Sequence, residues 1–108
     1  MDALVVFMTA ASREEAVRIA DLLVGAHLAA CVQLLPEIES VYRWEGKIER
    51  QSEVLLLAKT IKEKFGDLER EVRAIHSYET PEIVAVPIDQ ISEPYRKWLA
   101  QSLIRSGV

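Results

Sequence analysis

Hydrophobic positions along the chain of 108 residues include three short continuous runs. The first, Leu4–Thr9, contains β-branched residues and suits a strand buried on both faces. Val54–Ala58 and Ile83–Ile88 predict two further strands, and Pro81 enforces an extended entry into the last one. The runs lie far apart in the sequence, so other elements must connect them.

Apolar residues that recur every three or four positions predict helices between and after these strands. Ser12 and Glu15 have the spacing of a capping box, and Thr60 and Glu63 suggest a second one. Pro94 opens a closing helix. The three apolar stripes are Ala16, Ile19, Ala20 and Leu23, then Phe65, Leu68, Val72 and Ile75, and finally Tyr95, Trp98, Leu99 and Leu103.

The segment Ala29–Trp44 alternates between mostly apolar even positions and mainly polar odd positions in its second half, as a long strand does. Pro36 interrupts the alternation, so we expect a bend or a bulge there. Glu45 and Gly46 supply a tight turn, and the chain then returns toward Val54–Ala58. The segment therefore predicts a long hairpin.

The predicted order of elements is β-α-β-β-α-β with an extra C-terminal helix. Two right-handed crossovers around a central hairpin give an α+β fold of the ferredoxin-like type, with a four-stranded sheet and helices on one face. The chain is long enough for one hydrophobic core, so we expect a single domain over residues 1–108.

The predicted hairpin is too long for the rest of the domain. An unbroken strand over residues 30–44 would extend roughly 50 Å at about 3.3 Å per residue. A compact chain of this length spans only about 35 Å. The hairpin also carries apolar side chains that gain by leaving water, namely Ile38, Val41, Tyr42, Trp44 and Ile48. We therefore expect a homo-oligomer.

Composition narrows the classes of function. The net charge is -4 and no basic run occurs, so we expect no nucleic-acid partner. Cys31 is the only cysteine, so no internal disulfide can form. No apolar run is long enough to cross a bilayer, and Asp2 stands where a signal peptide would carry a basic residue. We expect a cytoplasmic protein without a membrane partner.

The sequence contains none of the common enzymatic motifs. It has no Gly-rich phosphate loop, no Cys-x-x-Cys pair, no His-Glu-x-x-His and no Ser/His/Asp set with elbow glycines. We therefore expect a protein that is not an enzyme. The helix that follows Ser12 offers free N–H groups that could bind an anion, as in acylphosphatases of this fold. That analogy predicts turnover of an acyl phosphate, and we expect none.

Three stretches of the chain resemble the CutA divalent-cation-tolerance family, namely Leu28–Val32, Ser40–Glu49 and His76–Ile83. The second stretch contains the block Tyr-Arg-Trp-Glu-Gly-Lys, which is specific to this family. The resemblance implies a ferredoxin-like fold, a homotrimer in which long hairpins contact neighbouring subunits, and a role in tolerance of divalent metals. The architecture of the family is similar to that of the trimeric PII signalling proteins. The residues of this chain that would form the trimer hairpin are Tyr42, Arg43, Trp44, Glu45, Gly46 and Lys47.

The residue types and the resemblance together give candidate metal ligands, and His76 and Cys31 each have an ordinary structural alternative. His76 is a natural copper ligand, and alternatively it serves the carbonyls at a helix end. Cys31 is a soft ligand, but cysteine is more often a small buried hydrophobe. Met8 stands where some members carry cysteine, and Ile75 stands where some carry a second histidine. We therefore expect weak or conditional binding of copper or another divalent metal. We expect His27 to be a solvated surface residue.

Polar residues near the end of the third strand and after the second helix form a second candidate site. Lys59, Tyr78, Glu79 and Glu82 could gather near a cleft between subunits. The simpler alternative is a set of surface ion pairs that contribute little, with Tyr78 as a packing aromatic. Two functions follow: a trimeric metal-tolerance protein, or a PII-like sensor of a small anionic metabolite or nucleotide, read by Lys59 and Arg43. A downstream protein partner is not identifiable from the sequence.

Overall fold

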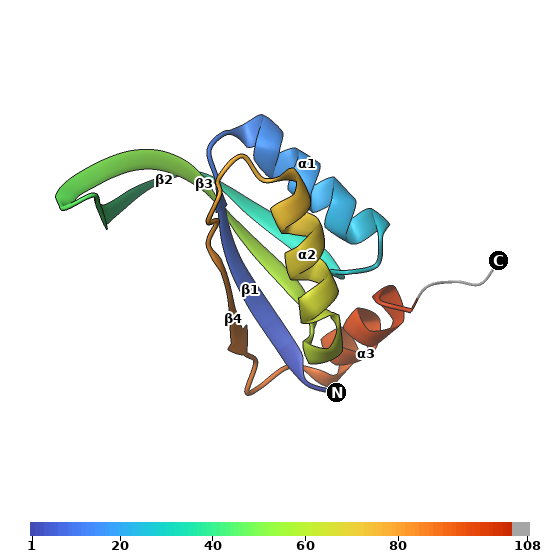
Figure 1. The fold of residues 1–108 in the computed structure, drawn as a ribbon. Coiled ribbons are helices and arrows are strands. Elements are labelled where there is room, and N and C mark those ends of the chain that lie inside the picture. The colour runs from blue at the N-terminus through green and yellow to red at the C-terminus, as the bar shows by residue number, and fades with distance from the viewer. Residues whose placement is uncertain (105–108) are drawn as a thin grey trace.

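The computed structural model describes residues 1–104 (Figure 1). The last four residues of the predicted domain, 105–108, lie outside the described residues. The elements follow the predicted order. They are β1 (Ala3–Ala10), α1 (Arg13–Gly25), β2 (Cys31–Trp44), β3 (Lys47–Ile61), a single 3-10 turn (Lys62–Lys64), α2 (Phe65–Ile75), β4 (Ile83–Pro87) and α3 (Glu93–Ser102).

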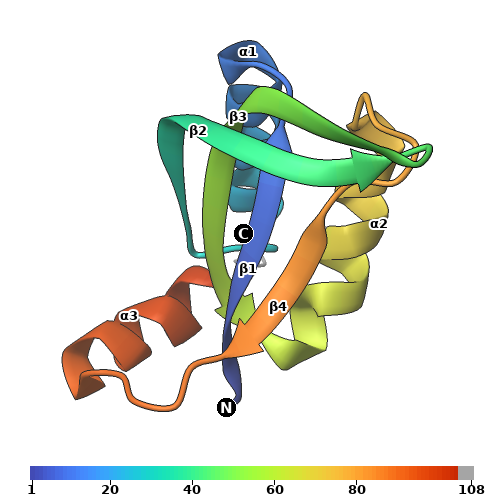
Figure 2. The same ribbon diagram turned by 90° about the vertical axis from the view of Figure 1, so that its left-hand side faces the viewer.

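The four strands form one sheet in the order β2-β3-β1-β4, and every neighbouring pair is antiparallel. Helices α1 and α2 cover one face of this sheet (Figures 1 and 2). Helix α3 lies at the end of the sheet where β2 begins, and Leu99 of α3 and Leu103, directly after it, pack with Ala30. The predicted ferredoxin-like fold is confirmed. None of the helices within residues 1–104 has the length and apolar character needed to cross a membrane.

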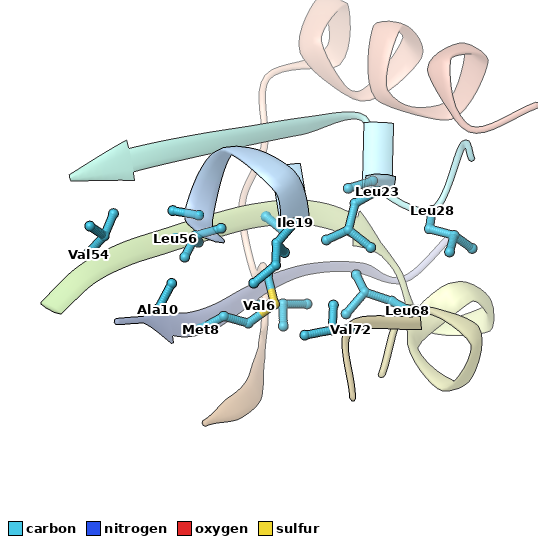
Figure 3. Close-up of a cluster of buried hydrophobic side chains, with 13 residues drawn as sticks. Val6, Met8, Ala10, Ile19, Leu23, Leu28, Val54, Leu56, Leu68 and Val72 are labelled. Carbon is cyan, nitrogen blue, oxygen red and sulfur yellow. The ribbon is translucent and has the colours of Figure 1, made fainter. Parts of the chain in front are cut away.

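The hydrophobic core fills the space between the sheet and the two covering helices (Figure 3). Strand residues of alternate position point into it, because successive side chains of a strand face opposite sides. Val6 and Met8 are fully buried there. The helical stripes close the core from the other side with Ile19, Leu23, Leu68 and Val72. Ile75, predicted on the second stripe, is exposed because it lies at the last turn of α2.

One of the two predicted capping boxes forms, and only in part. The hydroxyl of Ser12 accepts the backbone N–H of Glu15 at 3.2 Å, as expected for an N-cap. The prediction at Thr60 is wrong, because this residue is still part of β3. Its buried hydroxyl donates to the carbonyl of Leu28 at 2.7 Å and is not available to cap a helix.

The long hairpin of β2 and β3 projects beyond the rest of the molecule (Figure 1). The molecule measures 48 × 30 × 22 Å as a result. The register shifts between Leu35 and Ile38, which confirms the expected irregularity at Pro36. Two residues of β2 stand opposite one residue of β3 there, so the bulge exchanges the faces of β2. The turn has positive φ at Glu45 (49°) and Gly46 (79°), as a two-residue hairpin turn requires.

The second face of the sheet is apolar and carries little cover. Figure 2 looks onto this face, with the hairpin arching across its upper end and α3 at its lower end. Phe7 pairs with Leu57 on one side and with Val84 on the other. Val84 is 54% exposed, and Val86 and Leu35 are also exposed. We call this surface the open face.

Candidate functional site

A pocket of about 650 Å³ lies on the open face, where the hairpin leaves the sheet. We call it the hairpin-root pocket. The hairpin supplies one wall, and the loop between α2 and β4 supplies the opposite wall. Its lining combines carboxylates, aromatic side chains and small polar residues, and consists of Thr9, Ser40, Val41, Tyr42, Trp44, Gln51, Glu53, Tyr78, Glu79, Thr80 and Glu82.

A chain of hydrogen bonds runs along the floor of this pocket. The hydroxyl of Tyr42 donates to Gln51 Oε1 at 2.8 Å, and Gln51 Nε2 donates to the hydroxyl of Tyr78 at 3.0 Å. The Tyr78 hydroxyl in turn donates to Glu53 Oε2 at 2.8 Å. Because Tyr78 follows α2 and the other three residues belong to the hairpin, the chain fastens the hairpin to the loop.

The pKa of Tyr78 is raised to about 12, because its hydroxyl is desolvated by burial, donates to Glu53 and lies near that negative charge. The phenol therefore stays protonated at neutral pH and keeps donating. Glu53 itself is only 8% exposed. A carboxylate that is this deeply buried needs such a donor, since an unpaired charge would be costly to desolvate.

Both ring nitrogens of His76 form hydrogen bonds that hold the loop between α2 and β4 against β1. Its Nδ1 accepts the backbone N–H of Tyr78 at 3.0 Å, which places the ring proton on Nε2. Nε2 donates this proton to the carbonyl of Thr9 at 2.8 Å. The side chain is 0% exposed. Both nitrogens are thus engaged inside this chain, and neither has a free lone pair for a metal.

Glu15 lies 3.7 Å from His76 and holds the same loop. Its carboxylate accepts the backbone N–H of Ala11 at 3.0 Å, the N–H of Ser77 at 2.7 Å and the hydroxyl of Ser77 at 3.1 Å. Burial raises the pKa of Glu15, but the three hydrogen bonds from Ala11 and Ser77 outweigh it, so the pKa lies below its ordinary value of 4.5. The carboxylate thus bonds Ala11 and not the N–H of Ser12 that a capping box requires.

The three candidate metal ligands do not form one site. Met8 is fully buried in the core on the helix-covered face. Cys31 pairs with Lys59 near the opposite end of the sheet, on the open face. It is partly exposed and free, so it is not the fully buried hydrophobe that we considered. Within residues 1–104, no group of three His, Cys, Asp or Glu side chains could hold a metal.

The second set of candidates is brought together only in part. Tyr78, Glu79 and Glu82 line the hairpin-root pocket. Lys59 does not, because it donates to Gln33 and lies 6.0 Å from the ring of Tyr95 at the far end of the open face. The pocket therefore contains three carboxylates and no lysine or arginine among its lining residues.

Two further placements differ from the sequence analysis. His27 is not simply solvated, because its Nδ1 lies 3.2 Å from the carbonyl of Ser102 and connects the end of α1 with α3. Of the hairpin candidates, Tyr42 and Trp44 line the pocket, whereas Arg43, Glu45, Gly46 and Lys47 are exposed outside its lining. Sequence reasoning missed Gln51 and Glu53. The only signal for them was a pair of polar residues preceding an apolar strand on the returning arm.

A ferredoxin-like sheet with a projecting β2–β3 hairpin and an added C-terminal helix places the chain in a distinct class of small α+β proteins. Residues 4–102 match the family described as CutA1 divalent ion tolerance protein. The chain belongs to this family.

Solved structures support the assignment over nearly the whole length of the chain. The structure described as the periplasmic divalent cation tolerance protein CutA from Archaeoglobus fulgidus is 41% identical, with a TM-score of 0.92 over 94% of this chain and 99% of that one. The structure of CutA1 from Oryza sativa is 39% identical, with a TM-score of 0.94 over 98% of this chain and 97% of that one.

A longer relative is the chloroplastic protein CutA of Arabidopsis thaliana, 43% identical over 99 residues. The match covers 92% of this chain but only 54% of that protein. The chain therefore spans about half the length of that relative.

Replacing Tyr78 by phenylalanine should remove the tyrosine that titrates last. Since its folded-state pKa of about 12 exceeds the ordinary value of 10, its contribution to the free energy of unfolding is complete below pH 10 and is lost between pH 10 and 12. Absorbance at 295 nm during alkaline titration should lose its highest component in Tyr78→Phe. Tyr95→Phe is the control and should retain it. A late component that survives in Tyr78→Phe would contradict the assignment.

Glu15→Gln should destabilise the protein at pH 7 by about 1–3 kcal/mol, because an amide cannot accept all three donors. The folded pKa of Glu15 is depressed, so its contribution is present above about pH 4.5 and is lost as the pH falls through the folded value. The difference from wild type in urea unfolding should therefore shrink between pH 7 and pH 3. Glu14→Gln, on the exposed side of the same helical turn, is the matched control and should change little. An equal loss in both variants would refute the role of Glu15.

Proposed function

We propose that the chain acts as a homotrimeric, non-enzymatic protein of divalent-cation tolerance. The observation that carries this proposal is the open face. One side of the sheet is covered by α1 and α2, and the other has α3 at one end and leaves Leu35, Val84 and Val86 exposed. Exposed apolar area of this kind is normally covered by another chain.

The hairpin adds a second apolar surface that the chain itself does not cover. Trp44 is 60% exposed, and Val41, Tyr42 and Ile48 are exposed as well. A hairpin that projects from its domain gains about 25 cal/mol for each Å² of apolar area that a neighbour buries. Closed self-association covers the hairpin and the open face together. The number of three subunits rests on the family resemblance.

Metal tolerance in this proposal includes weak binding of copper or another divalent metal. His76 and Met8 are buried and, in the case of His76, fully hydrogen-bonded. Cys31 is the candidate of the three with partial exposure. A thiolate binds Cu(I) strongly, and a site on the open face could be completed by another subunit.

The cytoplasm is the compartment that we propose. A partly exposed, unpaired thiol at Cys31 suits a reducing environment. The relatives differ in this respect, since the Archaeoglobus structure is described as periplasmic and the Arabidopsis protein as chloroplastic.

The alternative is a PII-like sensor of a small anionic metabolite or nucleotide. Lys59 favours it, because this amine lies on the open face beside Gln33 and Tyr95, where subunits would meet. The hairpin-root pocket does not favour it, since its lining is acidic. A shift in melting temperature with a nucleotide panel, lost in Lys59→Ala, would support this alternative.

The double variant Tyr42→Asp, Trp44→Asp should lower the oligomeric mass in light scattering from three chains toward one. Two carboxylates in a buried apolar contact cost several kcal/mol per interface. Gln90→Asp, in the exposed loop before α3, adds charge outside the hairpin and should leave the mass unchanged. A double variant that keeps the wild-type mass would exclude the hairpin from the assembly.

Copper titration by calorimetry should distinguish the three sulfur and nitrogen candidates. We expect Cys31→Ser to lose Cu(I) binding, because it removes the thiol that is partly exposed. Met8→Leu, a change of similar volume in the core, should bind as wild type does. Cu(I) binding that persists in Cys31→Ser but is lost in a His76→Ala variant that still melts cooperatively would contradict the role of Cys31. It would identify His76 as the copper ligand.

A further inference from the structure

His76 is a titratable side chain enclosed where β1, α1 and the loop between α2 and β4 meet. Its ring has no exposed surface. Nε2 donates to the carbonyl of Thr9 at 2.8 Å, and Nδ1 accepts the backbone N–H of Tyr78 at 3.0 Å. The two bonds together require the neutral ring, because an imidazolium carries a proton on each nitrogen and can only donate. A proton that binds to Nδ1 therefore breaks the bond with Tyr78.

The carboxylate of Glu15 lies close to the same ring nitrogen. Its Oε2 is 3.7 Å from Nδ1, which is longer than an ordinary hydrogen bond but close for two opposite charges. The carboxylate is itself buried and is held by Ala11 and Ser77. A protonated Nδ1 thus has a charged acceptor within a small movement, whereas the N–H of Tyr78 would present it with a second donor. Protonation favours an exchange of partners at Nδ1, from Tyr78 to Glu15.

The groups that surround the ring keep their charge while a histidine titrates. The pKa of Glu15 lies below 4.5 and the pKa of Tyr78 is about 12, so the first stays ionised and the second stays protonated between about pH 8 and pH 5. β1 meets the ring with the carbonyl of Thr9, which does not titrate. On α2, Arg73 pairs with Glu69 at the exposed surface. A histidine ordinarily takes up its proton at about pH 6.5, inside this window.

Tyr78 carries a movement of the loop to the hairpin. Its hydroxyl donates to Glu53 Oε2 at 2.8 Å and accepts from Gln51 Nε2 at 3.0 Å, and both partners belong to β3. Glu53 is the charged group that β3 places on this tyrosine. The ring of Tyr78 also lies 4.8 Å from the ring of His76, measured between centroids. Displacement of the Tyr78 backbone therefore moves its hydroxyl away from both partners and loosens the root of the hairpin.

We propose that His76 and Glu15 form a pH-sensitive latch that fastens and releases the hairpin. While the ring is neutral, Nδ1 holds the N–H of Tyr78 and the hairpin is fastened. When Nδ1 takes up a proton from solvent, it releases this N–H and pairs with the carboxylate of Glu15, and the loop lets go of Glu53 and Gln51. The latch acts within one chain and lies beneath the loop, so it does not depend on the proposed trimer.

The ring nitrogens of a single histidine report its protonation directly. His27→Gln removes the only other histidine of the chain, so nitrogen NMR with 15N-labelled histidine observes His76 alone. We expect one protonated and one unprotonated ring nitrogen at about pH 8, and two protonated nitrogens on the acidic side of the transition. All samples contain a metal chelator, so a bound metal ion does not contribute to the shifts.

Amide hydrogen exchange, corrected for its intrinsic dependence on pH, reports release of the hairpin. Once the ring is charged, the loop 77–82 and the hairpin segment 38–53 should exchange about ten-fold faster or more, because each loses hydrogen bonds that hold it in place. The segment 54–58, in the core of the sheet, is the internal control and should keep its exchange rate.

His76→Asn separates the acceptor from the charge. The asparagine oxygen accepts the N–H two residues ahead, as in an Asx turn, and the side chain takes up no proton. This variant, made in the His27→Gln background, should lose the pH-dependent part of the exchange in both segments. Glu15→Gln removes the charge that receives the imidazolium and should move the transition of the ring to lower pH, whereas the exposed Glu14→Gln is the matched control and should leave it unchanged. If His76→Asn does not melt cooperatively, the ring shifts and exchange rates of His27→Gln decide.

A ring that becomes charged while the loop and the hairpin keep their exchange rates would overturn the proposal. The same holds for a ring that stays neutral down to the pH at which the chain unfolds, and for a His76→Asn variant whose exchange still responds to pH as the parent does. Light scattering on the same samples measures the assembly separately, so a failure of the proposed trimer and a failure of the latch are distinguishable.

Discussion

The hydrogen bonds to the buried carboxylate of Glu15 hold the loop after α2 and the start of α1 together, and the hairpin-root pocket depends on them. The carboxylate accepts two bonds from Ser77 and one from Ala11, and so ties the loop after α2 to the start of α1. That tie places His76 against the carbonyl of Thr9 and presents Tyr78 to the hairpin. Acceptor and donors lie more than 60 positions apart in sequence for Ser77, so the contact is made only by the completed fold. The pocket is therefore a product of tertiary structure and not of any single motif.

The sheet has two apolar faces, and the chain covers only one of them well. Helices α1 and α2 close the first face into a core of fully buried aliphatic side chains. The open face and the hairpin leave valine, leucine and aromatic side chains exposed. Cys31, Lys59 and the hairpin-root pocket all lie on this second face. The fold thus separates a face that its own helices cover from a face that the chain leaves largely open.

The order of elements, the bulge and the turn were predictable because each has a local cause: hydrophobic period, Pro36 and Gly46. The predictions that were wrong concerned residues whose contacts are made with residues far away in the sequence. Thr60 does not cap a helix, because the Leu28 carbonyl, 32 positions away, takes its hydroxyl. The sequence predicts Lys59 near Tyr78, but β3 places it at the other end of the open face. The sequence gives no signal for Glu53, because its partner Tyr78 lies 25 positions away and belongs to another part of the chain.

The bulge at Pro36 also determines what changes of length the hairpin tolerates. Before it, even-numbered residues such as Val32 and Leu34 face the core, and after it the even-numbered Tyr42 lies on the open side with Gln51 and Glu53. Removal of one residue between Leu35 and Ile38 would reverse this parity and turn Tyr42 to the opposite side. Insertions and deletions in this arm must therefore occur in even numbers if the chain of hydrogen bonds from Tyr42 to Glu53 is to form. A single-residue indel, harmless in most surface loops, would here exchange every contact of the arm.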